Sequence, residues 1–286
     1  MNLFRKVTEY KSDFTTYARE FKGYRWYKPI LVLVLTLILS SVFSLLIPVI
    51  LSALGIPNAT SHTGYNGLNT YTTDGLVTLA QSAIMVPSFL MAAKIVNERP
   101  ISSYLYSRKN WNWKLFTYPF LITVAVLIIP SVYLIITHGL RFNNHFTLLT
   151  LLLTVIMVPL QCWGEEFLFR STLMQAFGSW FKIPVLAIIL QAVLFMLVHP
   201  YNLIGQIDVF LAGIFYAVLA WRTKGLEATM ATHAANNLFL LILLGVDLYV
   251  LETEVSIEMF ILSAVFKGIT TVIILALNKK YGWSQD

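Results

Sequence analysis

The sequence predicts an all-α protein that crosses the membrane with about eight helices. Hydrophobic residues make up 57% of the 286 residues, charged residues only 12%, and the mean hydropathy is +0.72. The apolar residues form long stretches of about 20 residues, the length that crosses a bilayer core as a helix. Lys and Arg are concentrated in alternate loops, as in polytopic membrane proteins. The net charge of +6 follows this distribution, so we expect the bilayer and not nucleic acid as its partner.

Residues 1–28 precede the first apolar stretch and carry seven Lys and Arg residues interleaved with Phe, Tyr and Trp. This composition predicts a basic amphipathic segment that lies on the cytoplasmic face of the membrane. The segment lacks an apolar core of its own, so no cleavable signal peptide is expected.

Eight apolar stretches follow, separated by loops rich in polar residues. The expected ranges are about 29–54, 76–96, 115–137, 146–177, 183–198, 204–221, 226–244 and 257–277. The fourth stretch, at about 32 residues, is too long for a perpendicular helix, so it must tilt, kink near Pro159 or Gly164, or extend beyond the membrane.

Loop charge predicts the orientation of the helices. The segment 55–75 has no Lys or Arg, whereas the next loop holds Arg99, Arg108 and Lys114. With both termini in the cytoplasm, nearly all basic loop residues lie on that side. Arg141 is the exception, and the sequence offers no explanation for Lys267 inside the last helix. We expect an integral, multi-pass protein of a bacterial plasma membrane.

Two adjacent carboxylates, Glu165 and Glu166, lie in the fourth apolar stretch, where an uncompensated charge costs several kcal/mol. Arg170 follows Glu166 by four residues, so the two share a helix face in the order that favours an ion pair. Glu165 is rotated by about 100° and is available for another partner. The alternative is that both carboxylates are solvated at a cytoplasmic helix end.

Two further pairs have the same spacing of four residues. Phe195 precedes His199 at the end of the fifth helix, and His233 precedes Asn237 in the seventh. His199 could instead be an interfacial residue, and His233 with Asn237 could be a polar contact between helices. The depths of these residues along their helices permit, but do not require, one shared polar cavity.

These three patterns, in this order on successive membrane helices, resemble the CPBP family of CAAX proteases and bacteriocin-processing (Abi) intramembrane peptidases. The resemblance covers about residues 120–245. It divides the chain into the basic segment 1–28, helices 29–114 that match no family we can name, and a peptidase-like core at 115–280 with a polar catalytic cavity.

The resemblance also implies roles for the matching residues. Glu165 and His199 would activate a water molecule, and His233 and Asn237 would stabilise the oxyanion. Glu166, Arg170 and Phe195 would support them.

This set contains the groups that peptide hydrolysis needs: a base for water, donors for the oxyanion and an acid for the leaving amine. We favour this chemistry without a metal. The alternative is a zinc ion bound by Glu165, His199 and His233, with water in the fourth position.

The expected substrate is a membrane-associated peptide or protein, lipidated or hydrophobic. It would be cleaved in CAAX-type processing, bacteriocin leader processing or self-immunity. Two other functions remain open: a non-catalytic immunity or regulatory partner, and an ion or solute transporter. A transporter should show repeated halves, and no second copy of these motifs occurs in residues 29–140.

Overall fold

The computed structural model describes residues 7–9, 13–55, 69–250 and 254–285. These residues form helices without a strand, which confirms the all-α prediction. The helices are α1 (Lys28–Ser44), α2 (Ile47–Ala53), α3 (Thr73–Ala83), α4 (Met85–Val96), α5 (Ser102–Leu105), α6 (Trp113–Thr137), α7 (Leu148–Glu166), α8 (Met174–Phe181), α9 (Pro184–Leu197), α10 (Leu203–Thr223), α11 (Glu227–Leu244) and α12 (Ile257–Tyr281), with a 3-10 helix, η2 (Phe14–Glu20), and a π-helical segment, η4 (Phe167–Leu173).

Six helical runs in the described part of the chain are long and apolar enough to cross a membrane. They correspond to six of the predicted helices, so the count of eight is not confirmed. The other two also form helices, α9 and α11. However, α9 has only 14 residues, and α11 carries polar residues that lower its hydropathy.

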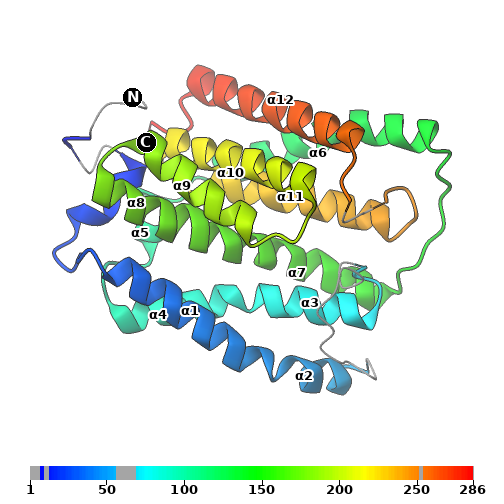
Figure 1. The fold of residues 1–286 in the computed structure, drawn as a ribbon, viewed down its shortest axis with the longest axis horizontal. Coiled ribbons are helices and arrows are strands. Elements are labelled where there is room, and N and C mark those ends of the chain that lie inside the picture. Colours follow the sequence, from blue (N-terminus) through cyan, green and yellow to red (C-terminus); the bar gives the residue numbers. More distant parts are fainter. Residues whose placement is uncertain (1–6, 10–12, 56–68, 251–253, 286) are drawn as a thin grey trace.

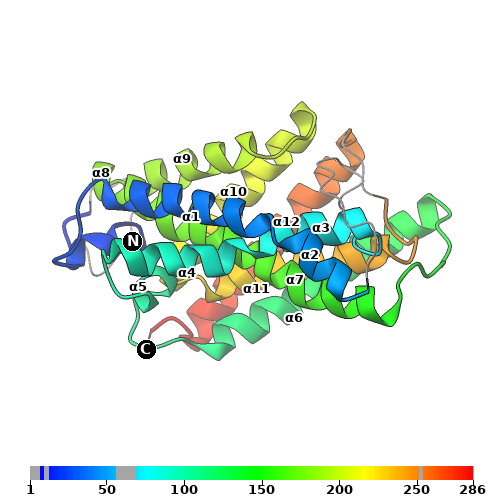
Figure 2. The ribbon, with the colours of Figure 1, turned by 90° about the horizontal axis from the view of Figure 1, so that it is seen from below.

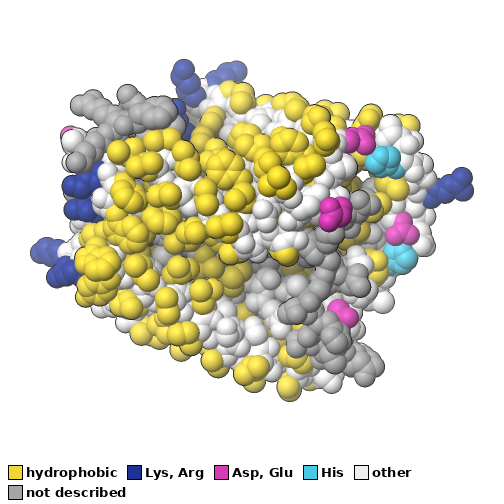
Figure 3. Space-filling view, in the orientation of Figure 1, with side chains coloured by type: hydrophobic (Ala, Val, Ile, Leu, Met, Phe, Trp, Pro, Cys, Tyr) yellow, Lys and Arg dark blue, Asp and Glu magenta, His cyan; other side chains and the backbone are white. Residues whose placement is uncertain are grey.

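The helices run along one long axis, with the start of α1 and the end of α12 at the same end of the bundle (Figure 1). Helices α7 and α11 lie side by side near the middle (Figures 1 and 2). Lys and Arg side chains gather near the end that holds α8, and acidic and His side chains gather at the other end (Figure 3). This separation agrees with the predicted charge of alternate loops.

The long fourth predicted helix is a continuous helical run from Leu148 to Phe181. It continues through Pro159 and Gly164, and its departure from α-helical geometry comes later, in η4. Gly164 allows close packing with α4, because a Cβ at this position would lie 2.8 Å from the Met85 Cβ. A π-helical segment shifts the register of the side chains that follow it, and such segments are frequent at functional sites.

The largest apolar core lies beside η4, where aromatic rings from several helices meet. Phe89 of α4 stacks on Phe167 at a ring distance of 4.5 Å, and Phe169 meets Phe195 of α9 edge-to-face at 4.9 Å. Helices in a membrane associate largely through such van der Waals packing. This packing holds α7, α9 and η4 in fixed positions around the polar residues.

Part of the N-terminal segment packs into the helix bundle. Phe14, Thr15 and Ala18 of η2 are fully buried, and η2 packs against α8. Asp13 caps η2 and also accepts a hydrogen bond from the buried Trp221 indole at 3.0 Å. This part of the segment therefore packs against other helices, and the position of residues 1–28 on the cytoplasmic face of the membrane stays a prediction.

Candidate active site

Glu166 is the last residue of α7 and is fully buried. Its Oε1 accepts hydrogen bonds from Arg170 Nη1 at 3.0 Å and from His233 Nδ1 at 2.8 Å. Its Oε2 accepts one from the Thr229 hydroxyl at 2.8 Å. The predicted pair of Glu166 and Arg170 is confirmed, and the carboxylate also joins α7 to α11.

Arg170 lies close to two aromatic rings. Its guanidinium carbon is 4.2 Å from the centre of the Phe195 ring and 5.3 Å from that of Tyr216. Tyr216 of α10 also stacks on the His233 imidazole at 4.9 Å. These contacts compensate a buried cation with one carboxylate and two π faces, and they restrict the orientation of His233.

Glu165 has a different environment from its neighbour. Its Oε1 accepts a hydrogen bond from the Gln161 side-chain amide, one turn earlier in α7. Its Oε2 is 3.7 Å from His233 Nε2, and its side chain is 14% exposed. Glu166 is therefore enclosed by protein, whereas Glu165 keeps access to the cavity, which is the division that helix spacing predicts.

His233 and Asn237 lie one turn apart on α11, and both line the same cavity as Glu165. Because Glu166 can only accept, His233 Nδ1 carries the proton in this contact. Its Nε2 then faces the Asn237 amide nitrogen at 3.4 Å. That nitrogen is also 3.5 Å from Gln161 Oε1. Gln161 thus contacts both Glu165 and Asn237.

His199 follows the end of α9, directly before Pro200, which disfavours helical geometry in the preceding residue. Its Nδ1 donates a hydrogen bond to the Phe195 carbonyl oxygen at 2.7 Å, since a carbonyl can only accept. The Phe195 ring lies 4.6 Å from the imidazole. Nε2 of the neutral ring is therefore unprotonated and can accept a proton.

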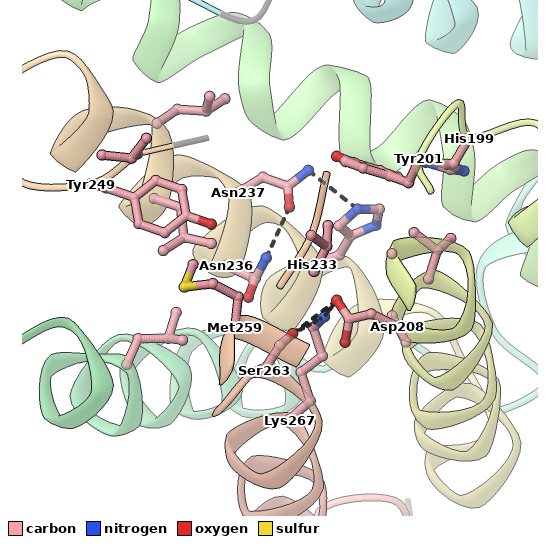
Figure 4. Close-up of a pocket in the computed structure, with 18 of the residues that line it drawn as sticks. His199, Tyr201, Asp208, His233, Asn236, Asn237, Tyr249, Met259, Ser263 and Lys267 are labelled. Atoms are coloured by element: carbon pink, nitrogen blue, oxygen red, sulfur yellow. Dashed lines mark hydrogen bonds and ion pairs between the residues drawn. The ribbon is translucent and has the colours of Figure 1, made fainter. Parts of the chain in front are cut away.

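One cavity of about 1090 Å³ is lined by all four predicted catalytic residues. Figure 4 shows His199, His233 and Asn237 around this cavity. The sequence permits a shared cavity, and in the fold all four residues line one, whereas Glu166 and Arg170 do not line it. The cavity is also lined by His138 and Glu254, near the acidic end of the bundle. The chemical roles of these residues stay predictions.

Three polar or aromatic contacts at the site are absent from the sequence prediction. Gln161 precedes Glu165 by four residues, so helix spacing contained a signal for this contact. Thr229 contacts Glu166 of another helix, so spacing contained no signal for it. Tyr216 comes from α10 and has no such local signal, because its contact with His233 depends on how two helices pack.

The fit of the site to a metal can be tested from its donors. Within the described ranges, no group of three or more His, Cys, Asp or Glu side chains is arranged to hold a metal ion. Of the three residues of the zinc alternative, Glu165, His199 and His233, the last has its Nδ1 held by Glu166. The choice between a metal-free site and a zinc site stays a prediction.

The fold and the site together define a multi-pass helical membrane protein with a Glu, His and Asn cluster inside its bundle. Residues 144–239 match the model of the Rce1-like family, described as type II CAAX prenyl endopeptidase Rce1-like. The match includes every predicted site residue and confirms the expected resemblance to CAAX-type peptidases over this range.

One relative matches more than half of the chain but is itself uncharacterized. The chain is 28% identical over 183 residues to the uncharacterized protein YyaK of Bacillus subtilis (strain 168). The match covers 58% of this chain and 61% of the relative, so it spans less than two thirds of that protein. No solved structure matches the chain.

Proposed function

We propose that this protein is an intramembrane endopeptidase that hydrolyses a peptide bond of a membrane-associated peptide or protein. The observation that carries the proposal is the position of Glu165 at 3.7 Å from His233, in a cavity that Asn237 and His199 also line. The match to a family of CAAX endopeptidases supports the same reaction.

In the proposed mechanism, the Glu165 carboxylate removes a proton from water, and the hydroxide adds to the peptide carbonyl carbon. The Asn237 amide donates to the oxygen, which becomes negative, and His233 Nε2 also donates when its ring is doubly protonated. The C–N bond then breaks, and the proton held by Glu165 passes to the leaving amine. His199 Nε2 accepts a hydrogen bond from the water and orients it.

Glu166 acts through His233 in this scheme. Its contact with Nδ1 fixes the ring plane and keeps Nε2 directed to Glu165 and Asn237. Arg170 and Thr229 hold Glu166 in turn.

The proposed substrates are hydrophobic or lipidated peptides, in CAAX-type processing or in bacteriocin leader processing and self-immunity. We place the protein in a bacterial plasma membrane with both termini in the cytoplasm. The largely apolar wall of the cavity and its place within the helix bundle support a substrate that enters from the membrane.

The test compares the membrane peptides of cells that carry wild type, Glu165→Ala or His199→Ala. We expect peptides that are cleaved only with wild type. Identical peptide profiles in all three would refute the peptidase proposal. If Glu165→Gln also kept the full cellular phenotype, the protein would act as a non-catalytic immunity or regulatory partner.

A further inference from the structure

The cavity that holds Glu165 extends toward one end of the bundle. This is the acidic end, which holds the α6–α7 and α11–α12 loops, and the basic end holds α8 (Figures 1 and 3). Helix α12 begins at the acidic end and lines the cavity only between residues 259 and 267, and α6 ends there and lines it only between 127 and 134. Among the described residues, none from α8 or from the segments 97–112, 182–183 and 224–226 at the basic end lines it.

Exposed side chains at the acidic end form the mouth of the cavity. Val198 and Val250 are 63% and 49% exposed, and the His138 side chain is 45% exposed. Glu254 is exposed as well. All four residues line the cavity that Glu165 lines. A side chain that is both exposed and part of the cavity wall lies where the cavity meets the surroundings.

Packed side chains fill the bundle between Glu165 and the basic end. Glu166 and Arg170 follow Glu165 toward α8 and are fully buried. Trp221 and Met230, near the basic ends of α10 and α11, are each 2% exposed and belong to the apolar core beside η4. These side chains separate the cavity from the basic end, so the access that the described residues provide is from the acidic end.

The depth of Glu165 suits an extended peptide. Glu165 follows Leu148, the first residue of α7 at the acidic end, by 17 residues. At about 1.5 Å per residue this places it about 26 Å from that end. An extended chain rises about 3.3 Å per residue, so about eight residues cover this distance. A peptide segment can therefore reach Glu165 through the mouth without the helices separating.

The charges along the cavity restrict the chemistry of that segment. Glu165, Asp208 and Glu254 line it, and among the described residues Lys267 is the one Lys or Arg that does. Lys267 donates to Asp208 Oδ2 at 2.7 Å, so this pair is neutral as a unit. Arg141 of the α6–α7 loop does not line the cavity. A cleft with an excess of one charge concentrates molecules of the opposite charge, which here are cations.

We propose that the substrate reaches Glu165 from the acidic end, as an extended peptide segment with basic or uncharged side chains on the outer side of the membrane. This inference rests on the proposed function in taking a peptide as the occupant. It also uses the orientation with both termini in the cytoplasm, which places the acidic end outside. An exported peptide that stays bound to the membrane is such a substrate, whereas a peptide confined to the cytoplasm is not.

Access is measured by labelling a thiol inside the cavity of the full-length protein in membranes. Ser82 of α3 lines the cavity, and its carbonyl oxygen is 3.6 Å from the position of a Cβ at Gly164, the residue before Glu165. Ser82→Cys therefore places a thiol near the depth of Glu165. Ser131→Cys on α6, which also lines the cavity, is the second variant.

Two exposed positions serve as references for the two ends of the bundle. Asn144→Cys lies in the α6–α7 loop at the acidic end, and Lys109→Cys lies at the basic end. Every variant also carries Cys162→Ala, which removes the natural thiol. Melting temperatures within a few degrees of the parent show that each variant is folded.

The probes are two methanethiosulfonate reagents that do not cross membranes, one with a trimethylammonium group and one with a sulfonate group. They are applied to right-side-out vesicles, to inside-out vesicles and to protein in detergent. Each rate is divided by the rate of the same reagent with a small thiol in solution, which removes the difference in intrinsic reactivity.

We expect both cavity thiols and Asn144→Cys to react in right-side-out vesicles, and Lys109→Cys to react only in inside-out vesicles. Reaction of the cavity thiols from the side that exposes Lys109→Cys would overturn the mouth at the acidic end. No reaction in either kind of vesicle would overturn it as well. Reaction of the cavity thiols together with Asn144→Cys in inside-out vesicles would overturn the outer location of the substrate.

The cationic reagent should react with Ser82→Cys about tenfold faster than the anionic one after this correction. Glu254→Gln should lower that ratio, and its side-chain carbonyl can still accept the hydrogen bond that Asn202 donates to Glu254 at 3.2 Å. A ratio near one would overturn the preference for basic segments, and an unchanged ratio in Glu254→Gln would overturn the part of Glu254 in it. Labelling needs no cleavage, so these results are readable even if the peptidase test fails.

Discussion

The His233 Nδ1 lies 2.8 Å from the Oε1 of the fully buried Glu166. Through this contact Glu166, which does not line the cavity, fixes the ring of His233, which does. Glu165 then lies on the other side of the ring, 3.7 Å from Nε2. The two adjacent carboxylates therefore differ in role because the helix directs one to Arg170 and the other to the cavity.

Glu166→Gln should destabilise the protein by about 3–5 kcal/mol, because it leaves the Arg170 cation buried without its carboxylate. The measurement is unfolding in detergent. The control is the double variant Glu166→Leu with Arg170→Met, which removes both charges and should cost less than the single change. A single change that costs less than the double change would contradict the buried pair as the origin of this stability.

Thr229→Val should lower stability by about 1–3 kcal/mol, because Glu166 Oε2 loses its hydroxyl donor at 2.8 Å and stays buried. Thr232→Val on the same helix is the matched control. In the described part of the chain the Thr232 hydroxyl has no hydrogen-bond partner, so the change should be close to neutral. Equal effects of the two substitutions on the unfolding transition would contradict this account of Thr229.

Gln161→Leu should lower kcat about tenfold or more while the protein stays folded, because Gln161 contacts both Glu165 and Asn237. The change is measured with a peptide that wild type cleaves. Gln161→Glu, which places a third carboxylate beside Glu165, should lower kcat further by charge repulsion. Wild-type kcat in both variants would exclude Gln161 from positioning the base.

Activity should survive strong chelators in detergent, since the mechanism needs no metal and the described donors do not form a metal-binding group. The experiment follows the cleavage rate before and after chelation and after addition of zinc. If chelation abolished the activity and zinc restored it, a zinc mechanism would be favoured instead, with Glu165, His199 and His233 as the candidate ligands.

Acid should weaken the contact between the α6–α7 and α11–α12 loops. A hydrogen bond from His145, at 2.9 Å, and a second from Asn143 lower the pKa of Asp247. A carboxyl with a lowered pKa stabilises the folded state above its unfolded pKa, and this contribution is lost as pH falls through the folded value.

The test is the melting temperature between pH 7 and about pH 3, the range in which an Asp of ordinary pKa is titrated. Asp247→Asn suits the left-handed backbone at this position, where φ is 59°. In this variant the melting temperature should fall less steeply as the pH is lowered. An unchanged slope in this variant would remove Asp247 from the acid dependence.

Helix periodicity in the sequence was sufficient to predict the contacts within one helix. Glu166 with Arg170 and Phe195 with His199 follow from spacings of four residues, and long apolar stretches predict most helix bounds to within a few residues. Periodicity also separates Glu165 from Glu166.

Contacts between helices were not predictable in the same way. The bond of Glu166 to His233 joins residues 67 positions apart, and that of Lys267 to Asp208 joins residues 59 apart. Both depend on the rotation and register of packed helices, which one sequence does not specify. The π-helical segment and the burial of η2 likewise arise from packing around aromatic side chains.

The most direct test of Glu165 as the base is a single-turnover reaction in H₂¹⁸O with purified protein and a peptide that wild type cleaves in membranes. We predict that wild type yields a new carboxyl terminus carrying one ¹⁸O and that Glu165→Gln binds the peptide equally well but yields no product. Cleavage by Glu165→Gln at the wild-type rate would contradict the central claim.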